Sequence, residues 1–256
     1  MQADWLRPDW QAPGVGGLMT TRHGGASAAP FDTLNLRFEL GDDDAAVVRN
    51  RALLAEACGC VPVYLNQVHG STVVRLDRSD ALPTATLQKA DACITTEPGI
   101  ACTAQVADCL PVLFTAPQGR AVGAAHAGWR GLSLGVLEAT VMSLCEAVHC
   151  EPHELQAWLG ACIGPARFEV GADVLAAFGA TPERCDPMRF RAARPGKSGK
   201  WLANLPLLAR DRLHAAGVRA ISGGAWCTVE DRSRFFSYRR DGVTGRMVAA
   251  VWIARR

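Results

Sequence analysis

The sequence lacks the features that direct a chain to membranes or to nucleic acid. No apolar run reaches the roughly 18 residues of a membrane span, and the start has no basic segment followed by an apolar stretch. With 27 basic and 25 acidic residues, the formal net charge of +2 creates no strong field toward nucleic acid or anionic lipid. These absences predict a cytoplasmic protein with no nucleic-acid or membrane partner.

Several short motifs are also missing. There is no Walker-type or dinucleotide-binding glycine pattern, no internal repeat and no low-complexity tract. The ten cysteines include no Cys-x-x-Cys pair, and the one-residue gap between Cys58 and Cys60 fits neither a zinc ribbon nor a thioredoxin-type pair. Their scatter through a chain of 256 residues argues against a disulfide scaffold, so we expect most of them to be reduced core residues.

The composition is that of an ordinary globular protein, with 49% hydrophobic and 20% charged residues. We expect one domain over residues 1–256. Apolar strings bounded by glycine or proline predict strands at Val15–Thr21, Val61–Val68, Thr72–Leu76, Ala92–Thr95, Ile100–Ala104, Leu110–Thr115 and Ala121–Ala125. Three-to-four periodicity predicts helices at Ala45–Ala57, Leu134–Val148, Val174–Phe178 and Leu202–Ala216.

The last part of the chain returns to strand patterns. We expect strands at Ile221–Thr228 and Arg246–Ile253, with a hairpin-like segment at Phe235–Tyr238 before a turn at Asp241-Gly242. The whole pattern predicts an α+β fold with layered mixed sheets. Long loops are expected at Asp77–Gln88 and Ala180–Lys200; the second, rich in basic residues such as Arg194 and Lys197, is either a solvated loop or a lid.

Two of the six histidines, His69 and His126, lie at points where an apolar run meets a glycine, which predicts imidazoles at strand ends. Between them, Asp108 and Cys109 interrupt a long apolar run, where a buried carboxylate requires a cation or hydrogen-bond donors. Two histidines and a thiolate suit zinc and leave its fourth position open for catalysis. The alternative is a metal-independent Cys109 nucleophile activated by His126, and the residues alone leave both readings open.

Other residues offer further chemistry. Arg22 and Arg130 lie in glycine-rich turns, where backbone amides can join a guanidinium in holding phosphate. Each of them is equally explained as a surface or capping residue. Gly131–Gly135 matches the G-x-S-x-G pattern of a serine nucleophile, although Ser133 is also explained as a residue that starts a helix.

The motifs together resemble one family. The resemblance rests on Asn66–Gly70, Ala107–Pro111, His126–Gly131, Gly160–Pro165, Phe168–Gly171, Phe236–Gly242 and Thr244–Arg246, in this order along nearly the whole chain. The family is the laccase-domain family, formerly described as multicopper polyphenol oxidases and now as purine nucleoside phosphorylases with adenosine deaminase activity. Phe168 stands where the family often has tyrosine, which does not affect the proposed ligands.

The resemblance implies zinc bound by His69, Cys109 and His126, and an α/β/β/α layered fold similar to the cytotoxic-necrotizing-factor catalytic domain. It implies phosphorolysis of adenosine, inosine or methylthioadenosine, so that the partners are a purine nucleoside and phosphate; relatives are also linked to peptidoglycan precursor editing. Copper fits less well, because oxygen reduction needs several further copper ligands. Asp108 would either shuttle protons or orient a ligand. Gln67 joins Arg22 and Arg130 as a predicted substrate-binding residue.

Overall fold

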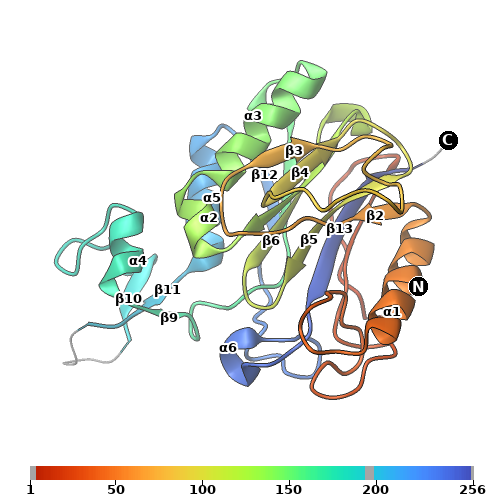
Figure 1. Ribbon diagram of the computed structural model, residues 1–256. Helices are drawn as coiled ribbons and strands as arrows, with labels where there is room; N and C mark the ends of the chain where they lie inside the picture. Colours follow the sequence, from red (N-terminus) through yellow and green to blue (C-terminus); the bar gives the residue numbers. More distant parts are fainter. Residues whose placement is uncertain (1–3, 194–198, 255–256) are drawn as a thin grey trace.

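The computed structural model describes residues 4–193 and 199–254, which form layers of helices and sheets (Figure 1). The helices are α1 (Asp44–Cys58), α2 (Trp129–Ser133), α3 (Val136–Val148), α4 (Ala172–Ala177), α5 (Leu205–Ala215) and α6 (Tyr238–Asp241). The strands are β1 (Val15–Met19), β2 (Val61–Val63), β3 (Val73–Arg75), β4 (Ala92–Thr95), β5 (Ile100–Val106), β6 (Leu110–Thr115), β7 (Val122–Ala127), β8 (Gln156–Leu159), β9 (Glu169–Val170), β10 (Phe190–Ala192), β11 (Trp201–Ala203), β12 (Ala220–Gly223) and β13 (Met247–Ile253).

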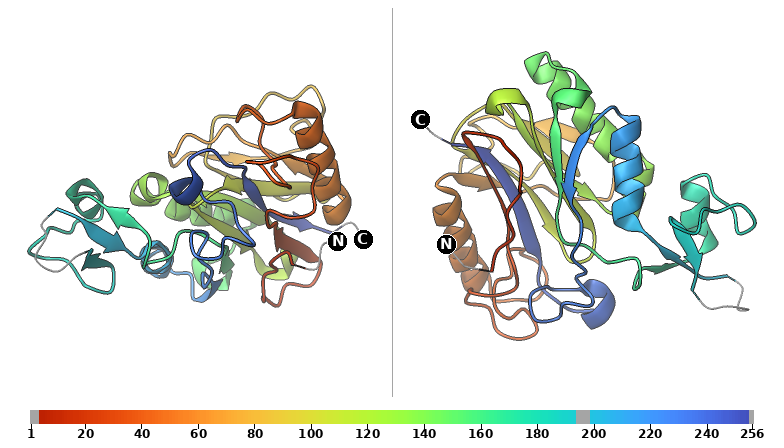
Figure 2. Two further views of the ribbon diagram at one scale, coloured as in Figure 1. Left: turned by 90° about the horizontal axis from the view of Figure 1, so that it is seen from below. Right: turned by 180° about the vertical axis from the view of Figure 1, so that it is seen from behind.

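Two mixed sheets form the centre of the molecule. One has the strand order β1-β13-β5-β2 and the other the order β12-β8-β6-β7-β4-β3. Within the larger sheet, β6 pairs antiparallel with β7 and β8, whereas β12 runs parallel to β8 and β3 parallel to β4. A third, three-stranded sheet of β10, β11 and β9 lies with α4 in an arm that projects from the layers (Figure 2).

The apolar strand sequences explain the layering, because successive side chains of a strand point to opposite faces. In β13, Met247, Ala249 and Val251 pack between the two sheets, whereas Val248, Ala250 and Trp252 pack on the other face of the smaller sheet. In β6, Leu113 belongs to the layer between the sheets, whereas its neighbours along the strand face the helices. The central strands of both sheets are therefore buried on both faces, as their nearly continuous hydrophobic sequences require.

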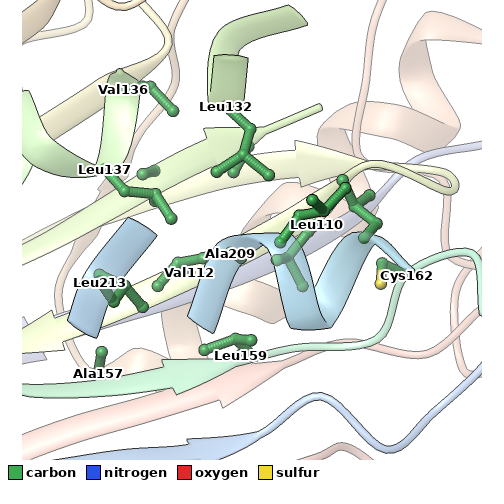
Figure 3. Close-up of a cluster of buried hydrophobic side chains, with 14 of the residues drawn as sticks. Leu110, Val112, Leu132, Val136, Leu137, Ala157, Leu159, Cys162, Ala209 and Leu213 are labelled. Atoms are coloured by element: carbon green, nitrogen blue, oxygen red, sulfur yellow. The ribbon is translucent and has the colours of Figure 1, made fainter. Parts of the chain in front are cut away.

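Helices cover the two outer faces. α3 and α5 pack on the larger sheet, where Leu137 and Leu213 meet Val112 of β6 and Leu159 of β8 in one cluster (Figure 3). α1 covers the smaller sheet and contributes Leu54 and Cys58 to the cluster that contains Trp252. The order helices, sheet, sheet, helix confirms the predicted α+β layered fold.

Most predicted elements are found, with shifted ends that have local causes. α3 begins at Val136 because Gly135 before it has a φ of +90°. The predicted helix Leu202–Ala216 begins only at Leu205, where the Asn204 side chain accepts a hydrogen bond from Leu207 N. The residues before this cap form β11, which pairs with β10.

Four predictions about single elements were wrong. The strand Val61–Val68 ends at Val63, and Ile221–Thr228 ends at Gly223, which together with Gly224 has positive φ. The segment Phe235–Tyr238 is no hairpin strand: Phe235 and Phe236 are fully buried between the sheets, and Ser237 then caps α6. The expected loop Ala180–Lys200 contains β10, and its residues Arg194 and Lys197 lie outside the described residues. β8 was not predicted at all.

The described helices include none that is long and apolar enough to cross a membrane. All ten cysteines lie within the described residues and are free thiols, as expected. Cys58, Cys93, Cys102 and Cys162 are buried, whereas the other six are half-buried, so fewer of them belong to the core than predicted.

Candidate metal centre

The three predicted metal ligands lie together. One ligand atom from each of His69, Cys109 and His126 falls within 4.8 Å of the others, and the described residues contain no second such group. His69 Nε2 lies 3.8 Å from Cys109 Sγ. The two imidazole rings meet edge to face, with centroids 4.8 Å apart and an interplanar angle of 73°. These residues are separated by up to 57 positions in the chain, so the fold itself creates the cluster.

Strand pairing places two of the three ligands. Cys109 directly precedes β6, and His126 lies next to the end of β7; the antiparallel register sets Pro111 opposite His126 and Leu110 opposite Ala127. The start of β6 and the end of β7 therefore lie side by side. His69 comes from a loop and has a φ of +61°, so it does not end a regular strand as the sequence predicted.

Asp91 joins the two histidine-bearing segments. Its carboxylate accepts hydrogen bonds from the backbone N–H groups of Val68 at 3.1 Å, His69 at 2.9 Å and Gly70 at 2.6 Å. It also lies 2.8 Å from His126 Nδ1. Asp91 thus holds the loop that carries His69 and directs His126 Nε2 toward the cluster, which is the usual support for a metal-binding histidine.

Sequence reasoning missed Asp91, although a signal was present. Asp91 stands between Ala90 and Ala92 at the start of β4, and it is 1% exposed. A carboxylate in such an apolar setting is costly to bury unless donors surround it. The same criterion singled out Asp108 and applies equally to Asp91.

The charges of the cluster favour a thiolate. Burial raises the pKa of Cys109, but the charge of His126 and hydrogen bonds from His126 and His69 outweigh this effect and lower the pKa to about 6. Burial lowers the pKa of His126, while the charge of Cys109 and the hydrogen bond with Asp91 raise it to about 9. The pKa of Asp91 is lowered, because its hydrogen bonds from His126 and the loop amides overcome burial. Cys109 as a thiolate and the two histidines as neutral imidazoles would hold a metal cation.

The distance between one pair of donors can be compared with that in a zinc site. Zinc bonds of about 2.3 Å to sulfur and about 2.0–2.1 Å to nitrogen, at tetrahedral angles, set these ligands about 3.6 Å apart. The distance of 3.8 Å between His69 Nε2 and Cys109 Sγ is close to this value. Two histidines and one cysteine would leave one tetrahedral position open, as in catalytic zinc sites.

Two glycines after His126 leave space for the cluster. A Cβ atom on Gly128 would lie 2.8 Å from Cys109 Sγ and 3.1 Å from His69 Cδ2. A Cβ atom on Gly131 would lie 2.7 Å from Gly70 O. Only glycine allows the start of α2 to approach the ligands this closely.

A cleft of about 140 Å³ opens beside Cys109. Its walls are mostly apolar and aromatic, with Trp129 from α2, Phe168 from the arm and Tyr238 from α6. Asp108 lies at the edge of this cleft with a φ of +96°, and its carboxylate accepts hydrogen bonds from Thr228 Oγ1 at 2.5 Å and Arg239 N at 2.6 Å. These bonds tie the loop between β5 and β6 to α6, which lies beside it in Figure 1.

The other residues that the sequence singled out for substrate binding or nucleophilic attack are not part of the cluster of His69, Cys109 and His126. Gln67 is 8% exposed and its amide is bonded to the backbone of Gln105 through Nε2 and Oε1, at 2.9 and 2.8 Å. Arg130 is exposed and stacks over Trp129, which lines the cleft. Ser133 Oγ donates to Arg130 O at 2.8 Å, and the residue ends α2 rather than forming a nucleophile turn after a strand.

The guanidinium group of Arg22 already forms three hydrogen bonds within the protein. Its Nε and Nη2 donate to the carbonyl and carboxylate of Asp32 at 2.9 and 3.0 Å, and Nη1 donates to Arg232 O at 3.3 Å. Arg22 lines a separate hollow with Arg232 and Asp241, which α6 separates from the cleft beside Cys109. The roles predicted for Arg22, Arg130 and Gln67 in substrate binding stay predictions.

Over nearly its whole length, the chain resembles two proteins that are both named purine nucleoside phosphorylase. It is 49% identical over 250 residues to "Purine nucleoside phosphorylase PA4543" of Pseudomonas aeruginosa, covering 97% of this chain and 98% of that protein. It is 44% identical over 249 residues to "Purine nucleoside phosphorylase YfiH" of Escherichia coli K12, covering 96% and 97%.

Solved structures have the same fold. The protein NMB0706 of Neisseria meningitidis matches with a TM-score of 0.88 and 43% identity, covering 98% of this chain and all of that one. YlmD of Geobacillus stearothermophilus matches with a TM-score of 0.89 and 34% identity, covering 100% and 98%. The model of the family described as "Multi-copper polyphenol oxidoreductase laccase" matches residues 17–254. This confirms the resemblance drawn from the motifs, and the chain belongs to this laccase-domain family.

Proposed function

We propose that this chain is a zinc-dependent purine nucleoside phosphorylase that also deaminates adenosine. The observation that carries the proposal is the His69, Cys109 and His126 cluster, whose ligand atoms lie within 4.8 Å of one another beside an aromatic cleft. The names of relatives up to 49% identical support the phosphorylase activity. Adenosine, inosine and methylthioadenosine are the proposed substrates, in the cytoplasm.

The cleft suits a purine. Trp129, Phe168 and Tyr238 line it, and aromatic faces stack well on nucleobases. Its volume of about 140 Å³ is below the roughly 300–1,000 Å³ of pockets that enclose whole drug-sized ligands. The base would therefore enter the cleft while the ribose extends over its rim.

In phosphorolysis a phosphate oxygen bonds to C1′ of the ribose, the bond between C1′ and the base nitrogen breaks, and the base takes up a proton. Zinc held by His69, Cys109 and His126 would supply Lewis-acid chemistry next to the bound nucleoside. Asp91 keeps the His126 ring in one tautomer and orientation through its contact with Nδ1. Asp108 is held by Thr228 and Arg239, so we assign it the positioning of α6 at the cleft rather than proton transfer.

A second candidate is a metal-independent cysteine hydrolase, which includes the editing of peptidoglycan precursors. Cys109, His126 and Asp91 are connected in the order of a cysteine–histidine–aspartate triad, and the pKa of Cys109 is lowered to about 6. His69 distinguishes the two candidates. A triad has no use for a second imidazole 3.8 Å from the sulfur, whereas a metal site does.

Metal analysis and product detection test the proposal. Protein purified without chelators should contain about one zinc per chain, and it should release hypoxanthine from inosine only when phosphate is present, with ribose 1-phosphate as the second product on HPLC. Removal of the metal should abolish the reaction and zinc should restore it. Full turnover by the metal-free protein, or base release that does not depend on phosphate, would contradict the phosphorylase proposal.

A further inference from the structure

Two arginines outside the predicted site lie side by side at the end of the smaller sheet. Arg246 directly precedes β13, and the register Met247 opposite Val106 places it beside the turn that leads from β5 to Cys109. Arg37 follows the buried segment that runs alongside Arg246, where Leu36 N donates to Arg246 O at 3.1 Å. Strand pairing therefore brings Arg246, and with it Arg37, beside the turn that carries Cys109.

One buried side chain fixes the spacing of the two arginines. Asn35 is fully buried, and its Oδ1 accepts hydrogen bonds from Arg37 N at 3.1 Å and from Arg246 N at 2.9 Å. Its Nδ2 donates to Arg37 O at 2.9 Å. The backbones of both arginines are thus held by the same amide, which leaves little freedom to separate them.

The electrostatics of the pair are unusual. Neither arginine forms an ion pair with an acidic side chain in the described part of the chain, although both are half-buried. Burial lowers the pKa of Arg246, the charge of Arg37 lowers it further, and the charges of Cys109 and Asp108 raise it. The two guanidinium groups therefore lie within electrostatic reach of each other and of the metal centre. Two like charges that are held close together and partly removed from water repel each other, and a bound anion would offset this repulsion.

The donors of the pair are largely free. Arg246 uses Nη1 for the carbonyls of Thr244 and Gly245, at 2.9 and 3.1 Å, and no bond from its other guanidinium nitrogens is found within the described residues. The Arg37 side chain has no hydrogen-bond partner there either. In the same turn, the Thr244 hydroxyl is buried and has no partner among the described residues. By contrast, the guanidinium group of Arg22 already donates hydrogen bonds to Asp32 and Arg232.

We propose that Arg37 and Arg246 form the binding site for the attacking phosphate, with the Thr244 hydroxyl as a further donor. This inference rests on the proposed phosphorylase function and names the residues that capture its second substrate. A protein with a net charge of only +2 creates no strong overall electrostatic field that would concentrate phosphate. A local pair of guanidinium groups is therefore needed to bind it. Two guanidinium groups can bind several oxygens of one phosphate and orient another oxygen toward the nucleoside.

Phosphate binding and kinetics of three variants test this site. Arg37→Lys and Arg246→Lys keep the positive charge but lose the planar guanidinium group, which can donate two parallel hydrogen bonds. Arg37→Lys removes no hydrogen bond of the described structure, because only the backbone of Arg37 forms such bonds there. Arg210→Lys is the matched control, because Arg210 donates to the carbonyls of Ile221 and Gly223 under α5. The zinc-loaded full chain is titrated with inorganic phosphate by calorimetry, and the KM values for phosphate and inosine are measured. Zinc content and thermal melts show that the variants remain folded and loaded.

We expect each site variant to weaken phosphate binding and to raise the KM for phosphate by about tenfold or more, with the KM for inosine changed less than about twofold. Arg210→Lys should leave both values within about twofold of the wild type. Phosphate affinity that is unchanged in Arg37→Lys and Arg246→Lys, or no phosphate binding by the wild type, would overturn the inference. If the wild type splits inosine with phosphate and both variants keep the wild-type KM for phosphate, the assignment of Arg37 and Arg246 fails but the proposed function does not. If phosphate binding depends on the arginines but no nucleoside is split, only the proposed function fails.

Discussion

Replacement of Asp91 by asparagine tests whether one buried carboxylate organises the metal centre. The carboxylate takes part in four hydrogen bonds, with Val68 N and Gly70 N on one oxygen and His69 N and His126 Nδ1 on the other. Asparagine keeps one oxygen and turns an NH₂ group toward the remaining two donors. We expect the oxygen to stay on the buried His126 ring, so that the amides of Val68 and Gly70 lose their acceptor.

The magnitude follows from the two lost bonds. A hydrogen bond to a charged group contributes about 1.5–3 kcal/mol, so two of them contribute about 3–6 kcal/mol. Val68 and Gly70 lie near the surface, where water can bond to the released amides. This reduces the expected loss in the free energy of unfolding to about 2–4 kcal/mol. Because His69 is carried by the same loop, we also expect zinc affinity to fall by about 10–100-fold.

Two measurements check this prediction. Urea unfolding of the metal-free proteins gives the change in the free energy of unfolding, and competition with a zinc chelator gives the change in affinity. Asp9→Asn serves as the control, because Asp9 is an exposed aspartate with no hydrogen bond or ion pair in the described structure. Asp91→Asn with a free energy of unfolding within about 0.5 kcal/mol of the control and an unchanged zinc affinity would refute the organising role of Asp91.

Three further variants probe the ligand, the space around it and the core. Cys109→Ala should lose zinc and activity together while the circular dichroism spectrum persists, because a catalytic metal contributes little to a core of this size; turnover by the metal-depleted variant would remove Cys109 from the mechanism. In Gly128→Ala the new Cβ would lie 2.8 Å from Cys109 Sγ, so zinc binding should weaken by roughly tenfold in a chelator competition, and wild-type affinity would show that the ligands tolerate the contact. Phe114→Ala should lower the free energy of unfolding by about 3–5 kcal/mol, whereas exposed Met142→Ala should change it by less than about 0.5 kcal/mol; equal losses in urea unfolding would contradict the assignment of Phe114 to the core.

Local patterns predicted most elements of the layered core. Strands β4 and β6 have the predicted boundaries, because a short apolar run that is buried on both faces is typical of a central strand. Errors arose where a local pattern competed with a distant contact. Phe235 and Phe236 resemble a strand in sequence, but the space between the two sheets takes up both rings and the chain then turns into α6.

The sequence by itself singled out the residues that could hold a metal: the side-chain chemistry of His69, Cys109 and His126 and the order of the motifs around them predicted this group. It did not determine that Asp91 supports two of these ligands, nor that Arg22 is occupied by Asp32 while Arg37 and Arg246 lie beside the metal centre. The contact of Asp91 with His126 depends on the pairing of β4 with β7, and the place of Arg246 depends on the pairing of β13 with β5 and on Asn35, which is 211 positions away in the chain. The residue type determines which bonds a side chain can form. Only tertiary structure decides which partner reaches it, because the partner is held in place by the packing of the whole core.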